Sequence, residues 1–178
     1  LQKWKKFHLR FKNIFVIDNQ KFKSSKNGKI ISVGPLEINS GFDLLIQSWI
    51  NIDEKLEIIG KGSQESSLNE LIKSNGLDNK IKIERNDSVK KIYEKFENAK
   101  CLIIPYLKEE NVDLIRQALN YEIPIIGTDL HEISKIIPRE FLATPKDLNS
   151  LQSVIEEIIP MLSKFDLSAI KRAVIENY

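Results

Sequence analysis

The feature that most constrains the fold is a regular alternation of short apolar runs with amphipathic stretches between residues 29 and 158. The apolar runs are KIISVG (29–34), LEIIG (56–60), KIKIE (80–84), KCLIIPY (100–106), IPIIGT (123–128) and FLATP (141–145). Runs this short, bounded by polar turn residues, predict strands that are buried on both faces. Because two parallel strands of one sheet connect through a right-handed crossover, the pattern predicts a mostly parallel sheet with helices on both faces.

The amphipathic stretches have the apolar spacing of helices that lie against such a sheet. They are GFDLLIQSWI (41–50), SSLNELIKSNG (66–76), SVKKIYEKFENA (88–99), DLIRQALNYE (113–122), HEISKII (131–137) and DLNSLQSVIEEII (147–159). Gly76 is placed to end the second of these helices, and Asp147 to cap the last. Together the units predict one doubly wound, Rossmann-like α/β domain, and IFVID (14–18) predicts a further strand before it.

The first 30 residues are strongly basic. They hold eight lysines and one arginine against one aspartate, a net charge of +8, so the other residues together carry −6. Such a block, with aromatic residues interleaved, is compatible with an anionic membrane, a nucleic acid or an acidic partner domain, and also with a solvated flank. We interpret residues 1–28 as a basic flank or interdomain segment that is able to contact a membrane surface and does not bind nucleic acid, and residues 29–178 as the domain.

Composition fits a single folded domain in a reducing compartment. A hydrophobic content of 42% with 29% charged residues is ordinary for a soluble globular domain. The lone Cys101 lies inside an apolar run, which indicates a buried core residue and excludes a disulfide framework. We see no secretory leader and no apolar run near the roughly 18 residues that span a bilayer, so we expect a cytoplasmic location. Because the sequence begins with Leu1, we expect the natural protein to extend further upstream.

Ligands of a doubly wound sheet bind at the carboxyl ends of the strands, near the point where the strand order reverses. The candidate site loops are therefore residues 34–41, 60–63, 85–88, 105–113 and 128–132. Neither a G-x-G-x-x-G fingerprint nor a phosphate-binding P-loop is present. His8 and His131 stand far apart without other ligands at metal spacing, so we expect no metal site. The pattern predicts a location without naming a ligand.

Several motifs in the same order resemble one family. The sequence reads VGPLEINSG (33–41) where the family has V-G-R-L-x-x-x-K-G, and IIGKG (58–62) where it has V-G-x-G. PYLKEENVDLIRQALNYEIPII (105–126) follows P-x-x-x-E-G-F-G-x-x-x-x-E-A-x-x-x-G-x-P-V-I, and TPKDLNSLQSVI (144–155) follows P-x-D-x-x-x-L-x-x-x-I. From about residue 29 to residue 158 the chain resembles the C-terminal, donor-binding domain of a retaining group 1 glycosyltransferase with the GT-B fold.

The resemblance implies transfer of a sugar from a nucleoside-diphosphate sugar to an acceptor, as in glycan or polysaccharide biosynthesis. An N-terminal domain outside this chain would hold the acceptor. The family stabilises the departing diphosphate with an Arg and a Lys from the first loop, glycine-loop amides and a helix N-terminus, without a metal or another cofactor. The first Glu of its E-x7-E motif binds the sugar hydroxyls, the second binds the ribose, and backbone groups after the third strand contact the nucleobase.

Part of this binding set is present. Gly34, Gly41 and Glu109 match the family, which gives Glu109 the catalytic position. The ribose-binding Glu falls on Gln117, which still accepts a hydrogen bond from a hydroxyl, more weakly than a carboxylate does. In the stretch from 109 to 128, Val112, Ile115 and Leu119 predict the apolar face of the helix that carries Gln117.

Other positions depart from the family. The phosphate-binding Arg falls on Pro35 and the Lys on Ser40, so both cations are absent. The family's Gly-Phe-Gly loop becomes residues 110–112, which adds the carboxylate of Glu110, and Glu122 stands where the helix would normally end in Gly. These changes remove about two charges of phosphate compensation and predict an impaired phosphate site.

Three further residues belong to the predicted site. Lys61 in IIGKG is the one basic residue newly placed beside it, and it is either a replacement for the missing cations or a solvated turn lysine. Asn86 and Asp87 occupy the turn that would contact the nucleobase. We therefore predict a nucleotide-sugar-binding domain, with a catalytically inactive accessory subunit of a glycosylation or export complex as the alternative. An unrelated Rossmann-type enzyme is the third interpretation.

Overall fold

The structure is a computed structural model and describes residues 28–86, 88–108, 111–137 and 139–164. The predicted strand at 14–18 and the basic segment 1–27 lie outside these residues. The strands are β1 (Lys29–Val33), β2 (Leu56–Gly60), β3 (Ile81–Arg85), β4 (Ala99–Ile104), β5 (Ile125–Thr128) and β6 (Leu142–Ala143). The α-helices are α2 (Phe42–Ser48), α3 (Glu65–Ser74), α4 (Val89–Phe96), α5 (Val112–Asn120), α6 (His131–Ile136) and α7 (Leu148–Ile158). Short 3-10 helices are η2 (Ile38–Ser40), η3 (Arg139–Phe141) and η4 (Ile159–Lys164).

The strands form one six-stranded sheet in the order β3-β2-β1-β4-β5-β6, with every neighbouring pair parallel. The order reverses between β1 and β4, so the sheet is doubly wound as the sequence predicts. The six strands and six helices that were predicted from residue 29 onward are all present. The last strand is shorter than its apolar run, since only Leu142 and Ala143 pair with β5.

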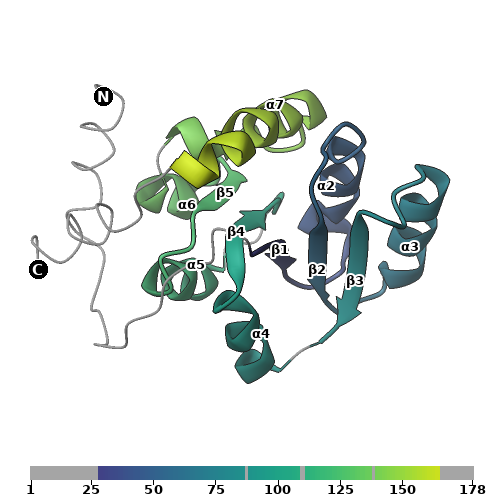
Figure 1. The fold of residues 1–178 in the computed structure, drawn as a ribbon, viewed down its shortest axis with the longest axis horizontal. Coiled ribbons are helices and arrows are strands. Elements are labelled where there is room, and N and C mark those ends of the chain that lie inside the picture. The colour runs from purple at the N-terminus through teal and green to yellow at the C-terminus, as the bar shows by residue number, and fades with distance from the viewer. Residues whose placement is uncertain (1–27, 87, 109–110, 138, 165–178) are drawn as a thin grey trace, which may run out of the picture.

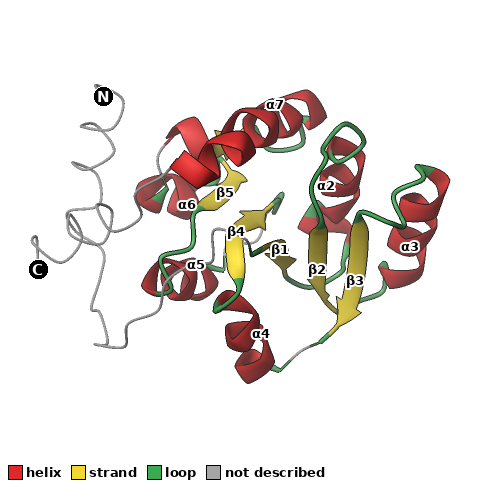
Figure 2. Ribbon diagram, viewed as in Figure 1, coloured by secondary structure: helices red, strands yellow, loops and turns green. Residues whose placement is uncertain are grey.

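Helices cover both faces of the sheet (Figure 1). The helices α2, α3 and α7 lie on one side, whereas α4, α5 and α6 lie on the other. In Figure 2 the strands form a single layer between the two groups of helices. The core is built from the strand side chains and the inner faces of these helices, with Trp49, Phe42 and Phe96 as its largest fully buried members. No helix among the described residues is long and apolar enough to cross a membrane.

Local signals at three helix ends are confirmed. The Asp147 side chain accepts a hydrogen bond from the amide of Ser150 at 3.0 Å and so caps α7. Gly76 ends α3 with a φ of +65°, the left-handed conformation that glycine adopts at low cost. Glu122, in the place of the usual glycine after α5, is forced into the same region with a φ of +57°.

Two buried positions qualify the sequence predictions. Cys101 is fully buried, and burial raises the pKa of its thiol to about 12, so it is an inert core residue as predicted. On α5 the prediction of the buried face is only partly right. Leu114, Ile115 and Ala118 are buried, whereas Val112 and Leu119 only flank the core. The face that meets the sheet is therefore rotated from the predicted one.

Candidate functional site

The predicted site loops lie at one edge of the sheet, around the carboxyl ends of β1 and β4. Gly34 follows β1, Gly60 ends β2, Pro105 follows β4 and Gly127 lies in β5. These four strands are adjacent and parallel in the order β2-β1-β4-β5, so their carboxyl ends point the same way. The prediction that these residues share the carboxyl edge is confirmed. It places the loop after β1 and the loop after β4 on either side of the switch point.

The loop after β1 lies against the loop after β4 through backbone contacts. The amide of Leu107 donates to the carbonyl of Asn39 at 3.2 Å. Gly41 adopts a φ of +72°, and a Cβ atom there would lie 1.9 Å from the carbonyl oxygen of Pro105. Only glycine fits at position 41, because the close approach and the left-handed conformation both exclude a side chain. The match of Gly41 to the family therefore has a structural cause.

The same loop is joined to the loop after β2. Leu36, which is fully buried, donates its amide to the carbonyl of Lys61 at 2.9 Å and accepts from the amide of Gln64 at 2.8 Å. A Cβ atom on Gly60 would lie 1.9 Å from the carbonyl oxygen of Gly34. Gly34, Gly41 and the backbone of Lys61 thus lie in loops that contact one another. Lys61 itself is exposed.

Tyr106 connects three of these strand ends, and the sequence analysis did not identify it. Its hydroxyl donates to the carbonyl of Val33 at 2.5 Å, and the hydroxyl of Thr128 donates to its carbonyl. The ring fills the space above Gly34, where a Cβ atom would lie 2.6 Å from the phenol oxygen. An aromatic residue directly after a buried strand was the only signal in the sequence. Tyr106 fixes the spacing of β1, β4 and β5 at the switch point.

Glu37 is a second residue of this edge that the sequence analysis missed. Its carboxylate accepts a hydrogen bond from the Ser63 amide at 3.0 Å and another from the Ser63 hydroxyl at 2.5 Å. These hydrogen bonds hold the pKa of Glu37 below its usual value of 4.5, so the carboxylate is charged at neutral pH. The loop that should carry two cations therefore carries a fixed anion.

The start of α5 reaches the same edge. The Asn111 side chain caps this helix by accepting from the amide of Leu114 at 3.0 Å. Gln117 lies further along the same helix and is half-buried. Glu109 and Glu110 lie outside the described residues, so the catalytic position assigned to Glu109 stays a prediction.

The turn that is predicted to contact the nucleobase lies at the outer side of the edge, after β3. The amide of Asn86 donates to the carbonyl of Gly60 at 3.3 Å, and its side-chain oxygen accepts from the amide of Ser88 at 2.9 Å. Its neighbour Asp87 lies outside the described residues. His131, which begins α6, is exposed, and its Nε2 lies 3.6 Å from a Glu132 oxygen. In the described part of the chain no group of three His, Cys, Asp or Glu could hold a metal ion.

The two positions that lack a cation differ in their surroundings. Pro35 is exposed, whereas Ser40 is 5% exposed in η2. An arginine at position 35 would reach solvent and the edge without rearrangement. A lysine side chain at position 40 would have to extend from a buried position to solvent, which costs conformational free energy.

Comparisons with known proteins agree with this architecture. A family model described as glycosyl transferases group 1 matches residues 13–165. Among curated protein sequences, none matches the chain.

Three solved structures share the fold. TarM from S. aureus, in a complex that contains UDP, has a TM-score of 0.73 at 18% identity over 93% of this chain and 36% of its own. HepE from Anabaena, in complex with UDP, has a TM-score of 0.68 at 15% identity over 92% of this chain and 52% of its own. The catalytic domain of cholesterol-alpha-glucosyltransferase from Helicobacter pylori has a TM-score of 0.68 at 15% identity over 85% of this chain and 98% of its own. The chain spans about a third of the TarM chain.

Proposed function

The chain belongs to the group 1 glycosyl transferases, and from that premise we propose that it is the domain that binds the nucleotide sugar. The donor would be a nucleoside-diphosphate sugar, and the sugar would pass to an acceptor in glycan or polysaccharide biosynthesis. An acceptor-binding N-terminal domain would complete the active protein. UDP is the first nucleotide to test, since two proteins of the same fold were solved with it.

The observation that carries this proposal is the convergence of four strand ends at the switch point. Backbone contacts of Gly41 and Gly60 hold the loops after β1, β2 and β4 together. Such a rigid edge, with a helix beginning at Asn111, offers backbone amides to an anionic ligand without the entropic cost of ordering loops.

The reaction would break the bond between the sugar C1 and the diphosphate oxygen and form a bond from C1 to an acceptor hydroxyl oxygen. The acceptor loses its proton, and the nucleoside diphosphate leaves with the electron pair of the broken bond. We propose that Glu109 binds sugar hydroxyls, Gln117 the ribose, and the turn at Asn86 and Asp87 the base. The proposal needs no metal or other cofactor, because backbone amides and Lys61 would meet the charge.

A catalytically inactive accessory subunit is the second candidate, and the charge of the first loop favours it. Pro35 and Ser40 carry no cation, while Glu37 adds a fixed carboxylate between them. A domain with this loop would keep the fold and bind a nucleoside while it contributes little to departure of a diphosphate. The basic segment 1–28, which lies mostly outside the described residues, would bring either protein to the cytoplasmic face of a membrane.

Calorimetric titration of the chain with UDP, GDP, their sugars and the bare nucleosides tests the proposal. We expect weak binding of the diphosphates by the unmodified chain. Restoring the cations as Pro35→Arg with Ser40→Lys should add two charge-assisted contacts, each of about 1.5–3 kcal/mol, and raise the diphosphate affinity by roughly a hundredfold or more. The bare nucleosides should gain little.

The control adds the same two charges at the opposite edge of the sheet, as Asn51→Arg with Asn79→Lys, where both residues are exposed. It should leave the diphosphate affinity near that of the unmodified chain. Equal gains for nucleoside and diphosphate would show that the loop after β1 is not at the phosphates. Tight diphosphate binding by the unmodified chain would favour the active transferase over the accessory subunit.

A further inference from the structure

The carboxylate of Glu37 has a place in the donor site that the family resemblance does not assign. Its backbone is bonded to both positions that lack a cation: the amide of Glu37 donates to the carbonyl of Pro35 at 3.0 Å, and its carbonyl accepts from the amide of Ser40 at 3.0 Å. Glu37 therefore sits between the two residues that would face the diphosphate. A charge on the Glu37 side chain therefore contributes to the electrostatic potential at a phosphate bound to the loop after β1.

The carboxylate is held by hydrogen bonds from neutral groups and is exposed to solvent. The Ser63 amide and hydroxyl both donate to it, and in the described part of the chain no basic side chain forms an ion pair with it. Gly62 makes the contact possible, because a Cβ atom there would lie 2.8 Å from a Glu37 oxygen and 2.3 Å from the Leu36 carbonyl oxygen. Hydrogen bonds from neutral groups hold the carboxylate in place but leave its negative charge intact.

We propose that Glu37 determines the charge selectivity of the donor site, by disfavouring a diphosphate at the loop after β1 while leaving nucleoside binding unchanged. The inference rests on the proposed function, since it concerns the same ligand. Glu37 is exposed, so its repulsion of a phosphate acts through solvent at the protein surface and weakens with salt. Glu37 is a specificity-determining residue that contacts Ser63 and acts on the ligand through its field.

Four variants separate charge from position. Glu37→Gln keeps a hydrogen-bond acceptor for Ser63 and removes the charge, while Glu37→Ala removes both. Ser63→Ala removes one hydrogen bond to the carboxylate and keeps the charge. Asp78→Asn removes one negative charge at the opposite edge of the sheet, where the side chain is exposed.

Affinities for UDP and for uridine are measured by calorimetry at low and high salt. We expect Glu37→Gln and Glu37→Ala to bind UDP about tenfold more tightly than the unmodified chain, with uridine unchanged. The gain should shrink at high salt, which a purely structural effect of the substitution would not do. Ser63→Ala and Asp78→Asn should show no gain.

Unchanged or weaker UDP binding in both Glu37 variants would overturn the inference while leaving the proposed function in place, provided that the unmodified chain binds UDP. A gain in Glu37→Ala alone, matched by Ser63→Ala, would also overturn it, because the contact between the loops rather than the charge would then matter. Absence of UDP and uridine binding in every variant, including Pro35→Arg with Ser40→Lys, would contradict the inference and the proposed function together.

Discussion

The carboxyl edge of the sheet is held together by backbone contacts and side-chain hydrogen bonds, whereas the amino edge is held together by ion pairs between charged side chains. At the carboxyl edge, Gly41 and Gly60 bring loops within contact of each other's carbonyls, and Leu36 pairs with the loop after β2. At the amino edge, the described contacts include ion pairs of Lys100 with Glu54 at 2.6 Å and of Lys80 with Asp53 at 3.6 Å.

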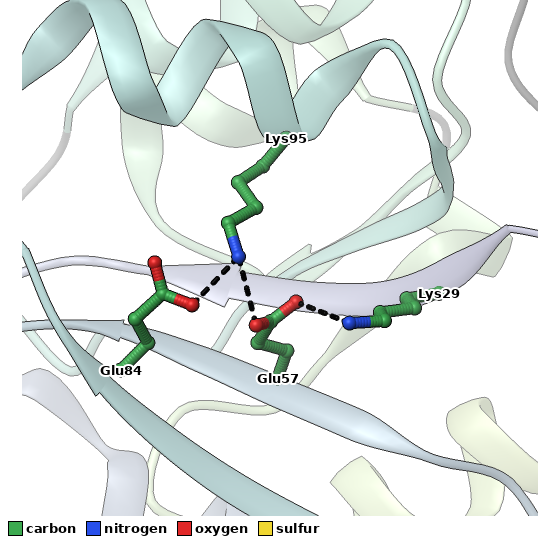
Figure 3. A network of polar contacts seen from close by, with 4 residues as sticks. All are labelled: Lys29, Glu57, Glu84 and Lys95. Atoms are coloured by element: carbon green, nitrogen blue, oxygen red, sulfur yellow. Dashed lines mark hydrogen bonds and ion pairs between the residues drawn. The ribbon is translucent and has the colours of Figure 1, made fainter.

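The amino-edge network extends into the interior beneath α4 (Figure 3). Lys95 of α4 contacts Glu57 of β2 at 2.9 Å and Glu84 of β3 at 2.6 Å, and Lys29 of β1 contacts Glu57 at 3.3 Å. The side chain of Glu57 is only 5% exposed. A cavity of about 390 Å³ opens beside these groups, and one of about 420 Å³ lies near Lys55 and Asn79.

This difference between the two edges bears on which side chains are available to contact a ligand. Backbone contacts close much of the carboxyl edge, and the side chains of Tyr106, Thr128 and Glu37 add to them. Other side chains of this edge are left to contact a ligand. At the amino edge the charged side chains pair with each other, and so they are not available for one. Three substitutions, separate from the ligand titrations, test this contrast.

Gly41→Ala should have the largest effect. The new Cβ atom would lie 1.9 Å from the Pro105 carbonyl oxygen, and the alanine would have to keep a φ of +72°. We therefore expect a loss of about 2–5 kcal/mol in the free energy of unfolding. Gly76→Ala is the matched control, because Gly76 has a φ of +65° but no atom within 4 Å of its added Cβ. It should lose only about 1–2 kcal/mol. Urea unfolding followed by circular dichroism measures both, and equal losses would show that the loop contact contributes nothing.

Lys95→Met should have the next largest effect. It removes one ammonium from the buried Glu57 and leaves Lys29, so we expect a loss of about 1–3 kcal/mol at pH 7. Met keeps most of the aliphatic length, so the packing of α4 on the sheet should survive. A loss smaller than the error of urea unfolding would show that the ion pair of Lys95 with Glu57 does not contribute to the free energy of unfolding.

The pH dependence of the same variant sharpens the test. Burial by itself raises the pKa of Glu57, but the ammonium groups of Lys95 and Lys29 outweigh it and hold the pKa below the usual 4.5. For a lowered carboxyl pKa, the stabilisation is present above the unfolded-state value and is lost as pH falls through the folded-state value. The difference in unfolding free energy between the unmodified chain and Lys95→Met should therefore be constant near pH 7 and shrink as the pH falls below 4.5. A difference that grows in acid contradicts this assignment.

Lys146→Gly should have the smallest effect, and it should stabilise. Lys146 is exposed, follows β6 at the carboxyl edge and adopts a φ of +64°, which costs a residue with a Cβ atom. We expect a gain of about 0.5–1 kcal/mol, and a smaller gain for Lys146→Asn, because asparagine tolerates this conformation better than lysine. Lys146→Ala should gain nothing, and a rise in thermal stability for the alanine variant equal to that for glycine would remove the conformational explanation.

The shared edge of the four strand ends was predictable because its signals are local. Gly34, Gly60, Pro105 and Gly127 stand where apolar runs give way to turns, and a parallel arrangement follows from the helices between the runs. The helix ends at Gly76 and Asp147 were predictable for the same reason, since capping depends on a few neighbouring residues. The roles of Glu109, Asp87, Asn86, Gln117 and Lys61 remain predictions.

The buried face of α5 marks the limit of such local reasoning. Apolar residues occur at 112, 114, 115, 118 and 119, an arc wide enough to be centred in more than one way. Packing settles the helix with Leu114, Ile115 and Ala118 inward, and Tyr121 at its end lies against Phe96 of α4, with ring centroids 5.6 Å apart. The rotation of a helix on a sheet depends on such neighbours, which the periodicity of one segment does not contain.

By itself the sequence determined the strands between residues 29 and 158, the helices between them and the absence of two cations from the loop after β1, and it predicts the carboxyl edge as the site. The tertiary structure alone decided the contacts between segments: Glu37 with Ser63, 26 residues apart, Glu57 with Lys95, 38 residues apart, and Tyr106 with Val33, 73 residues apart. The physical reason is the range of the interactions. Turns, caps and periodicity act over a few residues, whereas these partners meet only once the strand order brings β1 beside both β2 and β4.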